Sequence, residues 1–295
     1  MDENTKSKGS YIFNKTATVI AKMHNKIWPW QMPEKWIRGV RFDENSLDKA
    51  NSSYYQEIEY NYINGIMKYH LYDMAIPKGA CLDIGCGVGG MTYSLASTGN
   101  WSLNVGLDVD KSRIKAAQYY AKINGYNDNV SFLIGDGKRL PFVNNSISLV
   151  FAVSVLEHVY EWEDLVREVI RVLKEGGIAV FSFPPFLSPQ FRHLSAIIKM
   201  PWIHLLLGEK MTVAVAREIL RLNGQSSVTI PLINYKSPSA ELVRISVFGF
   251  IIELMRINGV TVRKLHFERY FRFLPMINYL PILSDLFSDH FLLIL

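Results

Sequence analysis

The chain has 295 residues, of which 49% are hydrophobic and 20% are charged, and its formal net charge is +5. This length and composition suffice for one large α/β domain with additions, and they exclude an intrinsically disordered chain. The basic residues are scattered rather than clustered, so no nucleic-acid partner is expected. An acidic substrate or an anionic membrane surface is compatible with the charge but is not established by it.

The two cysteines, Cys81 and Cys86, lie in a predicted strand and in the glycine loop that follows it. A disulfide between them would distort that turn, so we expect free thiols and a reducing, cytoplasmic environment. Asp2 and Glu3, with no long apolar stretch after them, argue against a signal peptide. No uncharged apolar run is long enough to predict a transmembrane helix.

Residues 1–75 are predicted to form a helical, aromatic cap that precedes the main domain. Apolar and aromatic residues recur at helical spacing between residues 55 and 69. Upstream of them lie Trp28, Trp30 and Trp36. These side chains either pack the cap onto the domain or line an acceptor pocket.

Residues 76–295 are predicted to form one α/β domain. Short, nearly continuous apolar strands alternate with helices, which indicates a largely parallel sheet covered on both faces. The predicted strands are 80–84, 103–110, 129–137, 146–154, 178–184, 260–267 and 290–295. The predicted helices are 111–125, 163–177 and 238–259, the last with Ser237 as its N-cap.

An insertion over residues 184–237 is expected to lie over the carboxyl edge of the sheet as a substrate-side lid. Its apolar stretch 197–207 either packs within this lid or contacts a membrane surface, where Lys199 and Trp202 would suit the headgroup zone together with His204 and Lys210. His193 and His204 are either packing or surface histidines, or they contribute to substrate binding.

The segment CLDIGCGVGG predicts a strand that runs into a glycine turn, and its G-x-G-x-x-G glycines are Gly85, Gly87 and Gly90. Both dinucleotides and S-adenosylmethionine (SAM) bind at such loops. A buried carboxylate at Asp83 would repel a phosphate but would attract a sulfonium and an ammonium group. Asp108 ends the next strand, where a carboxylate accepts ribose hydroxyls, and Asp136 follows the third strand, where it can accept from an adenine amine.

Four segments together resemble the class I SAM-dependent methyltransferases of the type 11 group. They are LDIGCGVGG, VGLDVD, GDGKRLPF and residues 154–184, and the resemblance resumes in the last helix and two strands. It implies a seven-stranded, mostly parallel Rossmann-like sheet of order 3-2-1-4-5-7-6 whose last strand is antiparallel. It also implies that SAM lies across the carboxyl ends of strands one to four.

The resemblance further implies which residues contact the cofactor. Asp83, Gly85, Gly87 and Gly89 are expected near the methionine part, and Asp108 is expected at the ribose. Asp136 and Gly137 are expected at the adenine, and Val153 and Ser154 beneath the sulfonium. Cys86 and Val109 are expected beside these residues. Some ubiquinone-pathway relatives carry Glu-x-x-Glu-His after the fourth strand and use a divalent cation. Here Ser154 replaces the first acid before Glu157 and His158, so no metal is expected.

The expected function is therefore SAM-dependent methyl transfer to a small molecule or glycan, with oxygen as the acceptor atom. His158 is the candidate general base for a hydroxyl acceptor, and the alternative is that it caps or packs a helix. A lipid-linked or quinone-type acceptor at a membrane surface is the alternative substrate class. An NAD-dependent oxidoreductase and a catalytically inactive SAM-binding protein are the alternative functions. The sequence does not predict the oligomeric state.

Overall fold

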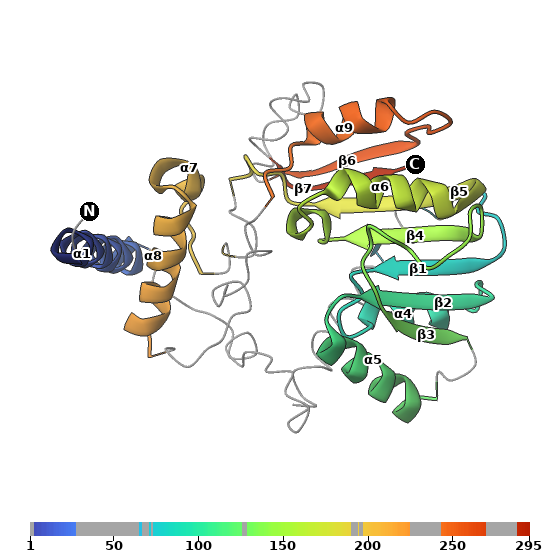
Figure 1. Cartoon of the computed structure of the whole chain (residues 1–295), viewed down its shortest axis with the longest axis horizontal. Coiled ribbons are helices and arrows are strands. Elements are labelled where there is room, and N and C mark those ends of the chain that lie inside the picture. Colours follow the sequence, from blue (N-terminus) through green and yellow to red (C-terminus); the bar gives the residue numbers. More distant parts are fainter. Residues whose placement is uncertain are drawn as a thin grey trace.

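The computed structural model describes residues 3–27, 65–66, 71, 73–125, 129–189, 194, 197–224, 243–269 and 288–295. At its centre lies one seven-stranded sheet with the order β3-β2-β1-β4-β5-β7-β6 (Figure 1). The strands are β1 (Ala80–Ile84), β2 (Leu103–Asp108), β3 (Val130–Ile134), β4 (Ile147–Val153), β5 (Leu173–Phe183), β6 (Lys264–Arg269) and β7 (Ser288–Ile294). β7 pairs antiparallel with both neighbours, whereas the other pairs are parallel. The predicted Rossmann-like sheet is thus confirmed.

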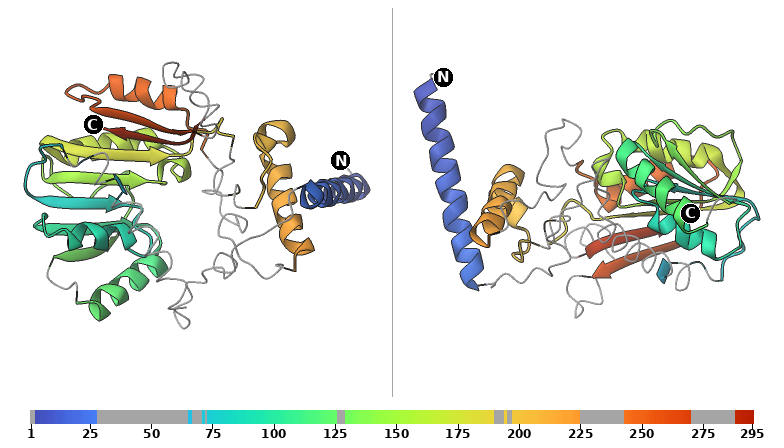
Figure 2. Two further views of the ribbon diagram at one scale, coloured as in Figure 1. Left: turned by 180° about the vertical axis from the view of Figure 1, so that it is seen from behind. Right: turned by 90° about the horizontal axis from the view of Figure 1, so that it is seen from below.

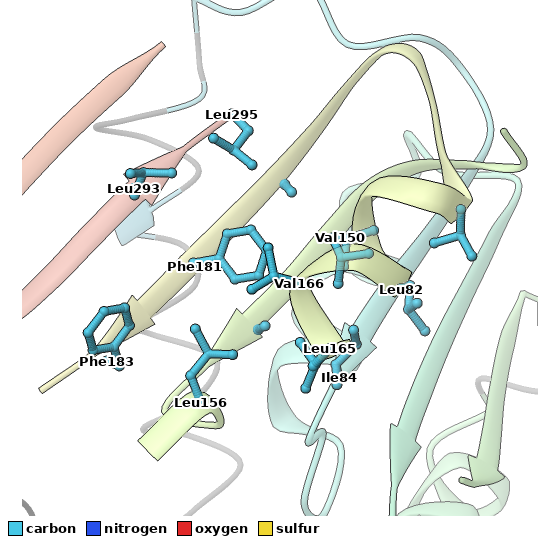
Figure 3. Close-up of a cluster of buried hydrophobic side chains, with 14 of the residues drawn as sticks. Leu82, Ile84, Val150, Leu156, Leu165, Val166, Phe181, Phe183, Leu293 and Leu295 are labelled. Carbon is cyan, nitrogen blue, oxygen red and sulfur yellow. The ribbon is translucent and has the colours of Figure 1, made fainter. Parts of the chain in front are cut away.

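Alternate side chains of each central strand point to opposite sides of the sheet, and these side chains are apolar on both sides. Helices therefore cover both faces of the sheet. On one face, α6 (Trp162–Val172) and α9 (Val247–Met255) pack over the strands. Figure 3 shows the centre of this cluster, where side chains of α6 meet those of β1, β4, β5 and β7. On the other face, α4 (Gly90–Ser97) packs together with Ile66 and Leu71. Beside β2 and β3, α5 (Lys111–Ile123) completes the domain.

Several predicted element boundaries are wrong. The last helix ends at Met255 rather than at residue 259, and the strand expected over 260–267 is Lys264–Arg269. The helix expected over 163–177 ends at Val172, and β5 starts at Leu173 rather than at residue 178. Pairing of Leu173 with Ile147 of β4 favours the extended conformation there over the local helix preference.

The last predicted helix also starts later than expected. It begins at Val247, where the Ser246 side chain accepts a hydrogen bond from the Gly249 N–H at 2.9 Å and so forms the N-cap. Ser246 itself has an extended backbone, with φ −104° and ψ 150°. Just before it, Phe186 N–H donates to Ile245 O at 2.9 Å and Ile245 N–H donates to Val243 O at 3.0 Å, so residues 243–245 do not continue the helix. Ser237 lies outside the described residues.

A separate helical unit contains α1 (Glu3–Ile27), α7 (Ile203–Leu207) and α8 (Glu209–Leu222). It has its own apolar core, which joins the two segments that the sequence placed in a cap and a lid. That core comprises Ala17, Ala21, Leu194, Ile197, Ile198, Ile203, Val215, Ala216, Ile219 and Leu220. Figures 1 and 2 show α1 on the side of α8 that faces away from the sheet. In the part of the chain that the structure describes, no helix is long and apolar enough to span a bilayer.

Contacts among His204, Phe186, Arg244 and Glu209 join the helical unit to the sheet domain. His204 Nε2 lies 2.8 Å from Phe186 O, and the two rings meet edge to face. The Arg244 guanidinium lies over the Phe186 ring and is 3.3 Å from Glu209 Oε1 at the start of α8. In Figure 1 the arrowheads of β1 and β4 point toward the side on which α7, α8 and α1 lie. The helical unit therefore stands on the carboxyl side of the sheet.

Candidate functional site

The glycine turn between β1 and α4 is built from left-handed backbone. Gly85, Gly87 and Gly89 have φ values of 69°, 55° and 89°, which side-chain-bearing residues rarely adopt. Gly85 N–H donates to Leu107 O of β2 at 2.7 Å, which ties the turn to the neighbouring strand. A Cβ atom on Gly85 would lie 2.4 Å from Val155 Cγ2, so the turn is also closely packed from the β4 side.

The Asp108 carboxylate fixes the other side of this turn. It is 5% exposed, its Oδ2 accepts from Gly87 N–H at 3.0 Å, and its Oδ1 accepts from Asp110 N–H at 2.8 Å. The Arg113 guanidinium is 3.9 Å from Oδ2. Because a carboxylate offers about four acceptor positions, these two backbone bonds leave capacity for a pair of ligand hydroxyls.

Asp83, near the end of β1, supplies a buried acid just before this turn. The side chain is 1% exposed, and its Oδ2 accepts from the Thr92 hydroxyl of α4 at 2.7 Å. Within the described part of the chain, Asp83 Oδ1 has no hydrogen-bond partner. Burial and, to a smaller extent, the charge of Asp108 raise the pKa of Asp83 to about 7, against the opposing effect of the Thr92 bond.

A buried carboxylate with an unused acceptor atom is costly unless a ligand compensates it. A cationic group near Oδ1 would supply both the missing hydrogen bond and the counter-charge. Thr92, which orients this acid, was not identified from the sequence. Its position two residues into the helix after the glycine turn is the signal that could have revealed it.

Two predicted site residues follow β3. Asp136 is exposed, and its Oδ1 accepts from Lys138 N–H at 2.9 Å. Gly137 is buried, and a Cβ there would lie 2.9 Å from Leu165 Cδ1. Gly135 N–H donates to Asp108 O at 3.0 Å, so this loop lies beside the Asp108 end of β2.

At the end of β4, the chain turns sharply. Ser154 has a left-handed φ of 54°, and its N–H donates to Ser182 O of β5 at 2.7 Å. Val153 is 8% exposed. A short helix (Leu156–His158) follows, in which Glu157 is buried and His158 is partly exposed. Val155 contacts the glycine turn, so the structure brings the predicted β1 and β4 residues together.

The other sequence candidates have different surroundings. The Cys86 side chain is buried beside Gly106 and Phe132, and its Sγ lies 3.8 Å from Gly87 O of the turn, whereas Val109 is 70% exposed. His204 is buried in the helical unit. His193, Trp28, Trp30 and Trp36 lie outside the described residues. Among the described residues, no cluster of three His, Cys, Asp or Glu side chains could hold a metal ion.

Comparisons with known proteins find similarity over about a third of the chain, within the sheet domain. A family model described as "Methyltransferase domain" matches residues 82–181. A sterol 24-C-methyltransferase of Yarrowia lipolytica is 33% identical over 111 residues, which is 37% of this chain and 29% of the relative. A norajmaline N-methyltransferase of Rauvolfia serpentina is 37% identical over 103 residues, which is 35% of each protein. The chain thus spans about a third of the length of the curated relatives it matches.

One solved structure resembles nearly the whole chain. It is a Methanococcus maripaludis protein assigned as an S-adenosyl-L-methionine-dependent methyltransferase, with a TM-score of 0.50 and 19% sequence identity. The alignment covers 88% of this chain and 94% of that chain. At this identity the likeness supports the fold, and the site rests on the geometry of this chain.

Proposed function

Because residues 82–181 form a class I SAM-dependent methyltransferase domain, we propose that the protein transfers the methyl group of SAM to a small organic acceptor. The observation that supports this proposal best is the buried Asp83 carboxylate beside a left-handed glycine turn, because its Oδ1 has no partner among the residues that the structure describes. A phosphate would be repelled by this acid, whereas the cationic amino acid part of SAM would be attracted. The same feature disfavours NAD as the ligand.

The residues of the turn fit SAM in the following proposed arrangement. Asp83 and the backbone of Gly85–Gly89 would hold the methionine part, and Asp108 would accept the ribose hydroxyls. Asp136 and Gly137 would face adenine, with Val153 and Ser154 beneath the sulfonium. When bound, SAM supplies a methyl group on a positively charged sulfur. The protein contributes the alignment of the acceptor and the exclusion of water, which account for much of the rate of such a displacement.

The acceptor is proposed at the level of its class. A soluble small molecule or glycan is our first candidate, and a lipid-linked or quinone-type molecule is the alternative. The two relatives named above are a C- and an N-methyltransferase, so oxygen as the acceptor atom remains a prediction of the sequence. His158, after β4, would remove the proton from a hydroxyl acceptor.

The direct test of the SAM site is calorimetry with the full chain and SAM. Asp108→Ala should weaken binding about 100-fold or more, because two charge-assisted hydrogen bonds of roughly 1.5–3 kcal/mol each would be lost. The matched control is Asp110→Ala, which removes another carboxylate from the same loop. The Asp110 side chain caps α5 by accepting from the N–H groups of Ser112 and Arg113. Equal losses in the two variants would contradict the proposed role of Asp108.

Catalysis is tested with methyl-labelled SAM and fractionated extract, because the labelled product identifies the acceptor and its reacting atom. For an oxygen acceptor, His158→Ala should lower turnover by roughly 10² to 10⁴ while SAM affinity stays unchanged. His266→Ala, at an exposed histidine of β6, is the control. SAM binding without any labelled product would instead indicate a binding protein without catalysis.

A further inference from the structure

The helix α1 presents two different faces, and contacts within the helical unit fix which one is buried. Ala17, Ala21 and His24 are 0–3% exposed and pack toward α8 and the segment that precedes α7. Thr18 Oγ1 donates to Glu218 Oε1 of α8 at 2.8 Å, and Lys199 N–H donates to His24 Nε2 at 3.0 Å. These contacts leave the opposite face of α1 directed away from α8 and the sheet (Figure 2).

The outward face carries an apolar stripe. Ile12, Val19, Met23 and Ile27 are 63%, 51%, 60% and 59% exposed. Their spacing of seven, four and four residues places them in one row along the helix. Single exposed apolar residues are ordinary, but an aligned row of four on one helix marks an interaction surface.

A row of cations accompanies the stripe. Lys15, Lys22 and Lys26 are exposed and lie at the helical positions next to the apolar row. Between residues 10 and 27 the sequence contains no Asp or Glu. A second copy of α1 would therefore bring lysines toward lysines with no acid to balance them. An anionic lipid surface accepts the apolar row below its headgroups and pairs its phosphates with the lysines.

We propose that α1 docks the protein onto an anionic lipid bilayer through Ile12, Val19, Met23 and Ile27, with the three lysines at the headgroup level. From the sequence, residues 197–207 were expected either to pack within the lid or to contact a membrane surface. In the structure Ile197, Ile198 and Ile203 of that segment are buried against α1 and α8, although Leu206 is 74% exposed. The proposal does not depend on methyl transfer.

The test is sedimentation of the full chain with two kinds of vesicle. One kind contains phosphatidylcholine alone, and the other contains phosphatidylcholine and phosphatidylglycerol in equal amounts. We expect sedimentation with the anionic vesicles and little with the neutral ones. Absence of binding to the anionic vesicles overturns the proposal.

Two pairs of variants distinguish binding through the apolar stripe and the lysines of α1 from non-specific binding to vesicles. Met23→Asp should weaken vesicle binding about tenfold or more, whereas Met255→Asp, at an 81% exposed methionine of α9, should not. The triple change of Lys15, Lys22 and Lys26 to Gln should weaken binding about 100-fold, since each lysine near an anionic surface contributes about fivefold. The same change at the exposed Lys111, Lys115 and Lys122 of α5 is its control.

Equal effects within either pair overturn the proposal, because binding would then not localise to α1. All the substituted side chains are exposed, so circular dichroism and thermal unfolding should match the wild type and confirm that the variants fold. Analytical ultracentrifugation tests the alternative that a second copy of the chain binds the apolar stripe. A wild-type dimer that Met23→Asp dissociates would assign the stripe to a second copy of the chain and would also overturn the proposal.

Discussion

Asp83→Asn is expected to remove a pH-dependent part of the free energy of unfolding of the SAM-free protein. The pKa of Asp83 is raised from 3.8 to about 7 in the folded state. A shift of about 3 units at about 1.36 kcal/mol per unit corresponds to about 4 kcal/mol. Because the folded-state value is the higher one, this stability is fully present below pH 3.8 and is lost as the pH rises through about 7.

Urea unfolding of the wild type and Asp83→Asn at about pH 5.5 and about pH 8 measures this contribution. At about pH 5.5, some 1.5 units below the folded-state pKa, the wild type regains about 2 kcal/mol that it lacks at about pH 8. The free-energy difference between the two proteins should therefore shift by about 2 kcal/mol between the two conditions. Titration of all other groups cancels in this difference, and so does the fixed cost of the extra amide donor.

The same variant tests whether the buried acid serves SAM. Asp83→Asn should weaken SAM binding at about pH 8 by roughly tenfold or more, because the cation loses its counter-charge while the shape is kept. A free-energy difference that is the same at both pH values would refute the titration of Asp83 in this range. Unchanged SAM affinity would refute its role as the counter-charge.

Three further predictions concern the scaffold of the site. In urea unfolding, Gly85→Ala should destabilise the protein by at least about 2 kcal/mol more than Gly99→Ala. Both glycines have a left-handed φ, but of the two only a Cβ at Gly85 would meet another atom, Val155 Cγ2 at 2.4 Å. Equal losses would show that backbone strain alone matters. Thr92→Val should raise the pKa of Asp83 further and enlarge the pH dependence of unfolding, because the hydroxyl that stabilises the carboxylate is lost. Asp110→Ala should cost about 1 kcal/mol in the same assay as a lost N-cap, and a larger loss would mean that this side chain does more than cap α5.

The central sheet could be predicted because its strands are buried on both faces and so form short apolar runs with clear ends. The prediction for β1 matched both ends of Ala80–Ile84. That the candidate site residues lie close together was predictable for a related reason, because residues that end neighbouring parallel strands meet at one edge. Asp108 therefore lies beside the glycine turn, and the Asp136 loop lies beside Asp108.

Features that depend on distant partners could not be predicted. Leu173, Lys174 and Glu175 are good helix formers, but pairing of Leu173 with β4 makes this segment part of β5. The packing of α1 on α8 joins residues about 200 positions apart, as in the Thr18–Glu218 bond, and no local pattern marks that pairing. The raised pKa of Asp83 likewise results from burial, which the residue's position in a strand indicates but does not quantify.

The two proposals bear on the same question, the acceptor. The carboxyl ends of β1 and β4, where the SAM site is proposed, point toward the side on which the helical unit stands (Figure 1). A bilayer bound by the outward face of α1 would lie on that side too, beyond α8. The acceptor would then approach from the lipid, which favours the lipid-linked or quinone-type class over a soluble glycan. Vesicle binding that depends on Met23 and the α1 lysines would therefore make membrane-embedded acceptors the first to assay with labelled SAM.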